Sequence, residues 1–411
     1  MNILITTQVY PPELHPTGVM VRELAIDFAR RGHKVTVATG FPHHPYGRLY
    51  PGYKKNWIQT ENQNGIRVMR VWHLINPRPS LLTRALVMAS QTLSFLIAAL
   101  NSSPPEVIIA GPPPIIGPLI SGLVAKRYGA KLVPFIYDIY PDIAVELGWL
   151  KNATVIKAAQ SMEKLMYHWS ERIILLSDRF RDILIDRKGV EPEKLAVIPL
   201  WLDGRDVEPM NRDNPWRKKM GISPDKFVVL YSGTIGLVSG AEVVLDAAQQ
   251  LTSYRNILFL MVGDGSAKDQ VEAKAQQAGL KNIRFLPLQP REYLSELQAT
   301  ADVSLVTLAP GRGRTSVPSK MLGYMAAARP VIAAVDSYCD TAELVRIAGC
   351  GKVVPPGQGK ELAEAIIHYY RHSEDRQSTG RKGRQYFLAN FERKVVLNEY
   401  ISLIEGLVTT N

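Results

Sequence analysis

The chain has few cysteines and no metal-ligand spacing. Its 411 residues contain only Cys339 and Cys350, too few for a disulfide framework and too far from other ligands for a zinc site. This suits a reducing compartment, and we expect a cytoplasmic protein. No set of His, Asp and Glu residues has the spacing of a metal centre, so we predict no metal requirement.

The chain also lacks a long apolar run and an N-terminal leader. The apolar stretch 85–100 has no ionised residue, but it falls short of the about 20 residues of a membrane span and includes Ser90, Gln91, Thr92 and Ser94. We expect a packed helix there, with a membrane span as the alternative. The start MNILITTQVYPPE has neither a basic leader nor a cleavage site, so we interpret it as the first strand of a fold.

Positive charge is abundant, because 49 Lys and Arg residues outnumber 38 Asp and Glu residues and give a formal net charge of +11. This favours anionic partners. The basic residues are dispersed and no nucleic-acid motif occurs, so we predict no nucleic-acid partner. A peripheral contact with the inner face of the cytoplasmic membrane stays open, beside a simple solvated face, because basic residues gather near Trp57 and Trp72: Lys54, Lys55, Arg67, Arg70, Arg78 and Arg84.

Both halves of the chain alternate apolar strands with helical segments. The strands are nearly continuous apolar runs, as expected for parallel sheets covered on both faces. We therefore predict an α/β fold with two Rossmann-like, doubly wound domains that face a cleft. The stretch 199–215 has the composition of a linker. We expect an acceptor-binding domain over 1–203, a nucleotide-sugar-binding domain over 204–390, and a helix within 391–411 that packs back on the first domain.

The segment 314–333, RTSVPSKMLGYMAAARPVIA, is the most informative part of the sequence. A helix that opens at Pro318 presents unpaired backbone N–H groups, and Arg314 and Lys320 add fixed positive charge. This pattern predicts a phosphate site; an ordinary helix joined to a strand is the alternative. GDGSAK, at 263–268, is only half of a dinucleotide fingerprint and lacks the third glycine, which is weak evidence for NAD.

Functional residues of parallel sheets gather in the loops that follow the strands. On this basis Asp138 could orient an acceptor hydroxyl or accept its proton, although an Asp there could also cap the next turn. The other acceptor-side candidates are His15, His43, His44 and Asp142. For Asp142 a capping role is the alternative, and for the paired histidines a plain surface position.

Five motifs in order resemble one known family. They are YPPELHPTGV at 10–19, YDIYPDIAVELGWL at 137–150, YSGTIG at 231–236, VGDGS at 262–266, and the PSK helix ending in ARPVIA at 328–333. Together they resemble the GT-B glycosyltransferases of family 4, within them the group that builds exopolysaccharides such as colanic acid. The resemblance covers nearly the whole chain.

The resemblance implies a retaining hexosyltransferase that moves a sugar from a nucleoside diphosphate donor, UDP-linked in our prediction, to a glycan or lipid-linked acceptor without a cofactor. Lys320 would stabilise the departing diphosphate, and Asp138 would be the second catalytic residue. Gly18 would let the backbone approach the phosphates. The predicted donor-binding set is Gly18, Gly233, Thr234, Gly263, Leu286, Arg312, Arg314, Ser316, Val317, Pro318, Ser319 and Lys320.

The sequence departs from the family at two places. Thr315 and Gly323 stand where the family has a pair of glutamates, and TIGLVSG offers no basic pair after the Ser-Gly strand end. We expect Arg312 and Arg314 to replace the missing positive charge. Two other functions stay open: a GT-B-shaped sugar-nucleotide 2-epimerase, which needs no acceptor, and a non-catalytic scaffold that binds nucleotide-sugars.

Overall fold

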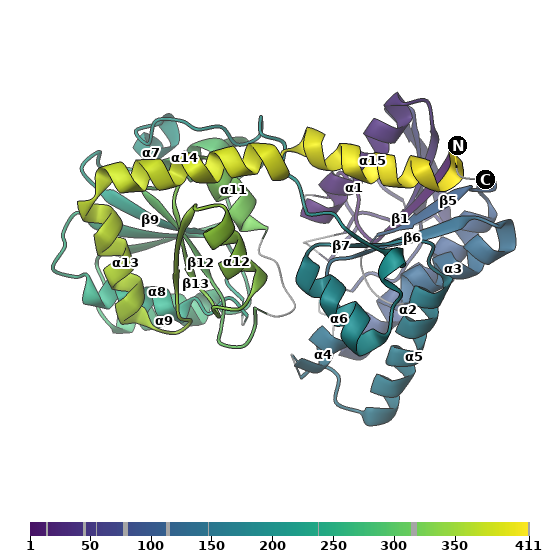
Figure 1. Cartoon of the computed structure of the whole chain (residues 1–411), viewed down its shortest axis with the longest axis horizontal. Coiled ribbons are helices and arrows are strands. Elements are labelled where there is room, and N and C mark those ends of the chain that lie inside the picture. Colours follow the sequence, from purple (N-terminus) through teal and green to yellow (C-terminus); the bar gives the residue numbers. More distant parts are fainter. Residues whose placement is uncertain are drawn as a thin grey trace. The chain divides into compact units, whose positions relative to one another are not determined.

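The computed structural model divides into two compact units. Unit 1 comprises Met1–Pro199 and Leu397–Asn411, and unit 2 comprises Leu200–Val396. Each unit is an α/β body in Figure 1. The structure describes residues 1–13, 15–43, 47–54, 56–76, 81–111, 116–146, 148–236, 238–313 and 319–409.

Unit 1 contains an eight-stranded sheet in the order β3-β4-β2-β1-β5-β6-β7-β8. Every pair of neighbours is parallel except β3 and β4, which form an antiparallel hairpin at one edge. The strands are β1 (Asn2–Thr7), β2 (Lys34–Gly40), β3 (Ile58–Gln63), β4 (Ile66–Val71), β5 (Val107–Ala110), β6 (Lys131–Ile136), β7 (Ile173–Leu175) and β8 (Leu195–Val197).

The helices of unit 1 are α1 (Pro16–Arg30), α2 (Leu81–Leu100), α3 (Ile116–Tyr128), α4 (Asp142–Glu146), α5 (Ala153–Trp169) and α6 (Asp178–Lys188), followed by a 3-10 turn at Pro192–Lys194. The apolar stretch 85–100 is part of α2, whose Phe95, Ala98 and Ala99 pack into the core. Among the described residues no helix is long and apolar enough to cross a membrane.

Unit 2 contains a six-stranded, fully parallel sheet in the order β11-β10-β9-β12-β13-β14. Its strands are β9 (Phe227–Ser232), β10 (Ile257–Val262), β11 (Ile283–Leu286), β12 (Val303–Thr307), β13 (Val331–Ala334) and β14 (Gly351–Val354). Its helices are α7 (Pro215–Lys219), α8 (Glu242–Gln250), α9 (Lys268–Gln277), α10 (Leu294–Thr300), α11 (Lys320–Ala326), α12 (Asp340–Ile347), α13 (Gly359–Arg371) and α14 (Ser373–Asn390), with a 3-10 turn at Arg291–Tyr293.

Both faces of the unit 2 sheet are buried. Along β9, Val228 and Leu230 belong to one apolar cluster while Phe227, Val229 and Tyr231 belong to another. Successive side chains of a strand point to opposite faces, so the two clusters are the two sides of the sheet. Helices α8 and α13 pack together on the second side, and α11 packs against α14 on the first.

Helix α15 (Arg393–Thr409) begins in unit 2, and its residues from Leu397 onward belong to unit 1. There Tyr400 lies edge-on to Phe135 with ring centroids 5.1 Å apart, and His33 Nε2 lies 2.9 Å from Glu405 Oε1. These contacts join the end of the chain to β6 and to the segment that follows α1.

The structure confirms the α/β class and the two doubly wound sheets. The apolar patterns of the sequence did not predict β3, β4, β7, β8 or β14. Strands β7 and β8 have only three residues each, too short to give a periodic signal. In β3 half-buried and exposed residues alternate, as befits an edge strand with one wet face.

Candidate active site

Two glycine loops at the carboxyl ends of β9 and β10 form the floor of the candidate donor site in unit 2. Gly233 N donates to Val262 O at 2.9 Å, and Ile235 N donates to Asp264 O at 2.9 Å. A Cβ on Gly263 would lie 1.9 Å from Gly233 O, and Gly263 has a φ of +152°. Only glycine fits there, because both the backbone conformation and the approach exclude a side chain.

Lys320, the first residue of α11, reaches over these loops. Its Nζ lies 3.8 Å from the centroid of the Tyr231 ring and 3.7 Å from the point that a Cβ on Gly233 would occupy. Burial lowers the pKa of Lys320 to about 7, because a desolvated ammonium loses its hydration. The expectation of a fixed positive charge is therefore wrong for Lys320: its charge depends on pH and on an anion beside it.

Tyr324 ties α11 to the end of β9. Its hydroxyl accepts from Ser232 N at 2.9 Å and lies 3.2 Å from Ser232 O, and its side chain is fully buried. On the other side of the same strand end, Tyr231 donates to Thr234 O at 2.7 Å. These two tyrosines fix the position of Lys320 relative to the glycine loops.

The other predicted donor residues are placed as follows. The Leu286 carbonyl accepts from Gly263 N at 3.1 Å, so Leu286 supports the glycine loop from below. Arg312 is half-buried in the loop after β12, and Ser319 is exposed at the position before α11. The remaining four, Arg314, Ser316, Val317 and Pro318, lie outside the described residues, as does Thr315. Gly323 faces the side chain of Gln298.

Asp138 is the clearest candidate on unit 1. It follows the carboxyl end of β6, and burial raises the pKa of its carboxyl to about 6. Among the described residues it forms no hydrogen bond or ion pair, so the capping alternative has no support there. A partly buried carboxylate with a raised pKa at a strand end is able to accept a proton near neutral pH.

A second polar cluster lies where β1, β2 and β4 end. His43 N donates to Glu13 Oε1 at 2.9 Å, and His43 Nδ1 lies 3.2 Å from His73 Nε2. Burial, together with the neighbouring His43, lowers the pKa of His73 to about 4, so His73 is neutral at physiological pH. Arg70 is fully buried below this cluster, with Nε 2.9 Å from Glu61 Oε1; its assignment to a basic surface is therefore wrong.

Two other predicted residues, Asp142 and Gly18, make structural contacts within unit 1. Asp142 Oδ1 accepts from Lys188 Nζ at 2.7 Å, and Lys188 also pairs with Glu163 at 2.9 Å. A Cβ on Gly18 would lie 3.2 Å from the backbone of Val9 and Tyr10, so glycine there lets α1 pack on the loop after β1. His15 stands at the N-cap of α1, whereas His44 lies outside the described residues.

Sequence reasoning missed four side chains that shape these sites: Glu13, His73, Tyr231 and Tyr324. Glu13 and Tyr231 lie inside motifs that were noticed, but nothing in the motifs assigns them a contact. His73 is 30 residues from His43, and Tyr324 is 92 residues from Ser232. Only the sheet order brings these pairs together.

Two family descriptions match consecutive parts of the chain. "Glycosyl transferase 4-like domain" matches residues 17–201, and "Glycosyl transferases group 1" matches residues 213–386. The chain belongs to the GT-B glycosyltransferases of family 4. This glycosyltransferase is thus an enzyme of the hexosyltransferase class. Both matched families are glycosyl transferases, which favours sugar transfer over the epimerase and scaffold alternatives.

Full-length relatives agree with this assignment. The glycosyltransferase is 28% identical over 414 residues to WcaI of Escherichia coli K12, which is named as a colanic acid biosynthesis glycosyl transferase; the match covers 99% of this chain and 100% of WcaI. Sucrose-phosphate synthase of Thermosynechococcus elongatus superposes with a TM-score of 0.79 at 17% identity over 100% of both chains. Anabaena Alr3699/HepE, solved with UDP-glucose, superposes with a TM-score of 0.71 at 17% identity over 99% of this chain and 100% of its own. The two structures show the shared GT-B fold.

Proposed function

We propose that this glycosyltransferase moves a sugar from a UDP-sugar to a glycan or lipid-linked acceptor with retention of anomeric configuration. The proposal that unit 2 binds the donor rests on the position of Lys320 over the glycine loops of β9 and β10. The leaving group of transfer is a nucleoside diphosphate, and an ammonium beside it stabilises the charge that develops as the glycosidic bond to phosphate breaks. The UDP-glucose complex of the similar Anabaena protein supports uridine as the base.

The test of the donor class is thermal unfolding with UDP, GDP, ADP and CDP, each with and without Mg²⁺. We expect UDP alone to stabilise the protein by about 2.7 kcal/mol at a concentration one hundred times its dissociation constant. Magnesium should change little, because among the described residues no group of three or more His, Cys, Asp or Glu side chains could hold a metal ion. A shift with another nucleotide would replace uridine, and no shift at all would favour the scaffold. The anomeric proton coupling of the product reports retention.

For the acceptor, the proposal assigns Asp138 the role of accepting the proton of the acceptor hydroxyl. We expect Asp138→Asn to lower transfer about 10²-fold, the usual contribution of a positioned acid or base. The same change should raise the free energy of unfolding at pH 8 by up to about 3 kcal/mol, since each pKa unit corresponds to about 1.4 kcal/mol and solvent screening reduces the effect. The raised pKa of Asp138, about 6, sets the sign: ionisation costs stability as pH rises from about 4 to 6, so the gain should vanish below pH 4.

Denaturant unfolding at several pH values, with initial rates, checks both effects. Asp186→Asn is the matched control, because Asp186 is exposed on α6 of the same unit. If Asp138→Asn kept full activity, Asp138 would have no role in transfer. If the stability difference did not depend on pH, burial of the carboxylate would not be its cause.

The acceptor in this proposal is presented at a membrane surface. Four side chains of α2, Leu86, Leu93, Ile97 and Leu100, are each 39–60% exposed and repeat at the spacing of one helix face. Leu123 of the adjoining α3 is also exposed, and Lys126 and Arg127 follow it. An apolar stripe beside basic residues suits the interface of an anionic bilayer.

We expect Leu93→Asp to weaken retention on phosphatidylglycerol vesicles by at least about tenfold, because a carboxylate resists entry into the interface. Co-sedimentation measures the retained fraction. Leu388→Asp is the control, since Leu388 is similarly exposed on α14 in unit 2. Equal retention of the two variants would exclude α2 as the membrane contact.

A further inference from the structure

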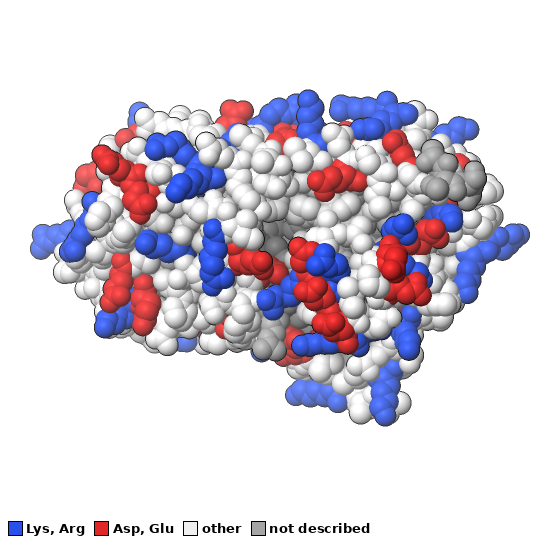
Figure 2. All heavy atoms as spheres, viewed as in Figure 1, with Lys and Arg blue, Asp and Glu red and all other residues white. Residues whose placement is uncertain are grey.

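A cavity of about 290 Å³ lies at the amino ends of β12 and β13, at the edge of the unit 2 sheet opposite to the glycine loops. Asp302 and Pro330, which directly precede the two strands, form its base. Arginines dominate the rest of its lining: Arg212, Arg329, Arg376 and Arg381. In the view of Figure 2, Lys and Arg side chains cover part of the surface at α14, which supplies the last two.

One carboxylate faces these four guanidinium groups, and it is already fully engaged. Asp302 accepts from Arg212 Nη1 at 2.8 and 3.1 Å and from Val228 N at 2.9 Å. The nearest approach of Arg376 to it is 3.8 Å, beyond hydrogen-bond distance. With four guanidinium groups and one carboxylate, the lining of the cavity has a net positive charge.

The geometry of the arginines leaves donors unused. Arg329 Nη2 donates to Met210 O and Ala299 O, whereas its Nε is buried without a hydrogen-bond partner among the described residues. Arg381 forms no hydrogen bond or ion pair with a described residue. Burial lowers the pKa of Arg329 and of Arg376; the charge of Asp302 opposes this shift, and repulsion from Arg212 adds to it. Unpaired buried donors and crowded like charges both cost free energy, and an anion relieves both.

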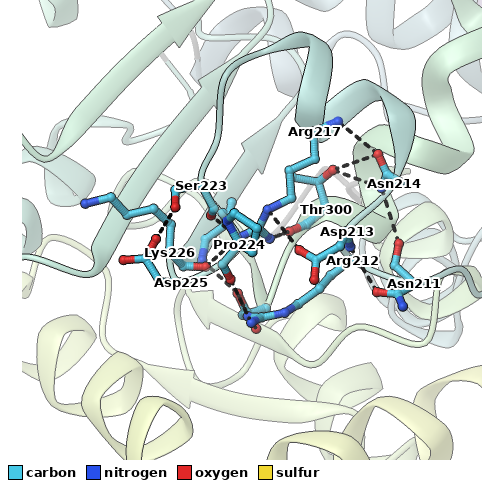
Figure 3. A network of polar contacts seen from close by, with 12 residues as sticks. Asn211, Arg212, Asp213, Asn214, Arg217, Ser223, Pro224, Asp225, Lys226 and Thr300 are labelled. Carbon is cyan, nitrogen blue, oxygen red and sulfur yellow. Dashed lines mark hydrogen bonds and ion pairs between the residues drawn. The ribbon is translucent and has the colours of Figure 1, made fainter.

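Hydrogen bonds hold the part of the lining that bears Arg212. Figure 3 shows Arg212 and Arg217 in one polar network with the segment 211–226. Arg217 is buried next to Arg212 and donates to the carbonyls of Thr300, Ser223 and Lys226. Arg212 instead spans from Pro224 O, at 3.0 Å, to Asp302. Its guanidinium is thus held at the cavity before any ligand arrives, which lowers the entropy lost on binding.

A second part of the lining, at Ala328, packs closely against α14. Ala328, which lines the cavity, has a φ of +55°, a left-handed conformation that is strained for a non-glycine residue. A Cβ on Gly380 of α14 would lie 2.2 Å from Ala328 O. Helix α14 therefore sits directly on this strained turn, which places Arg376 and Arg381 at the rim.

We propose that this arginine pocket binds a phosphate-bearing anion, separately from the donor site. Arginine forks match phosphate oxygens in pairs, and the volume is at the lower end of the range of about 300–1,000 Å³ typical of small-molecule sites. The shared chemistry is a phosphate monoester or diphosphate, carried either by a free small molecule or by a lipid headgroup.

Isothermal titration with pyrophosphate tests the site in a Lys320→Met background, which removes the ammonium of the donor site. We expect this background to bind pyrophosphate and to lose at least about tenfold in affinity when Arg376→Gln and Arg381→Gln are added, since each charge-assisted hydrogen bond contributes about tenfold or more to affinity. Adding Lys274→Gln and Lys360→Gln instead, on exposed positions of α9 and α13, removes the same charge and should leave affinity unchanged. No binding by the background, or equal affinity of the two multiple variants, would overturn the proposal.

The single variant Arg381→Gln controls for a folding defect, because Arg381 is exposed and forms no hydrogen bond or ion pair with a described residue. It should weaken pyrophosphate binding several-fold and leave the circular dichroism spectrum unchanged. Wild-type affinity would overturn the proposal. Co-sedimentation with phosphatidic acid vesicles, whose headgroup is a phosphate monoester, separates the two sources. If the vesicles retain the protein, pyrophosphate displaces it, and phosphatidylcholine vesicles do not retain it, the result supports the site with a lipid headgroup as ligand. Pyrophosphate binding without such retention supports it with a free phosphate ester as ligand.

Discussion

Lys320→Met should lower the rate of sugar transfer by about 10³-fold. The lysine lies over the glycine loops, and loss of a preorganised charge from a developing anion costs about 10²–10³ in rate. The defect should appear mainly in kcat, because the charge on the leaving group grows in the transition state. Initial rates with saturating donor measure it.

The pH dependence of nucleotide binding gives an independent signature of Lys320. Its pKa in the free protein is about 7, and a bound diphosphate favours the charged form. Binding should therefore take up a proton, and affinity should fall as pH rises from about 7 to 9, by up to about tenfold per unit. Titration in buffers of different ionisation enthalpy counts the proton. In Lys320→Met this dependence should be absent.

Misfolding is not expected to explain the loss. The pKa of Lys320 in the folded chain lies below that of an unfolded lysine, so the unfolded chain binds the additional proton and the buried amine costs stability below about pH 10. Methionine fills a similar volume without that cost. Lys320→Met should hence be at least as stable as the wild type at pH 7. A variant with unchanged kcat, or one that loses activity only because it unfolds, would refute the assigned role.

Gly263→Ala should lower the free energy of unfolding of unit 2 by more than about 4 kcal/mol. The new Cβ would lie 1.9 Å from Gly233 O, a distance that no rotamer relieves because both atoms are fixed by the backbone. The strand ends of β9 and β10 must then separate, which breaks the Gly233 N to Val262 O bond. Losses of this size are rare for single changes and indicate backbone conflict. Guanidinium unfolding followed by circular dichroism measures it.

Gly279→Ala is the matched control for this experiment. Gly279 also has a positive φ, +64°, but a Cβ there would have nothing within 4 Å. Only the left-handed conformation is then penalised, by about 1–2 kcal/mol. A loss at position 263 no larger than at 279 would show that the close approach of the two glycine loops is not required.

The sequence was sufficient for much of the fold. Apolar runs that alternate with amphipathic helices predict two doubly wound sheets, because a parallel strand buried on both faces must be apolar along its length. The strand ends predict where Gly233, Gly263 and Lys320 lie in unit 2 and where Asp138 lies in unit 1, since function in such sheets lies beyond the carboxyl ends. These features depend on local pattern and chain order, both of which are written in the sequence.

The tertiary structure decided what the local pattern cannot contain. The lowered pKa of Lys320 and the raised pKa of Asp138 arise from burial by distant residues. The contact between Tyr324 and Ser232 joins residues 92 positions apart, and the arginine pocket assembles side chains from a loop, a helix end and α14. The sequence determined which chemical groups are present. Packing determined their charge and their partners, because solvation and the repulsion between like charges depend on which atoms surround a group.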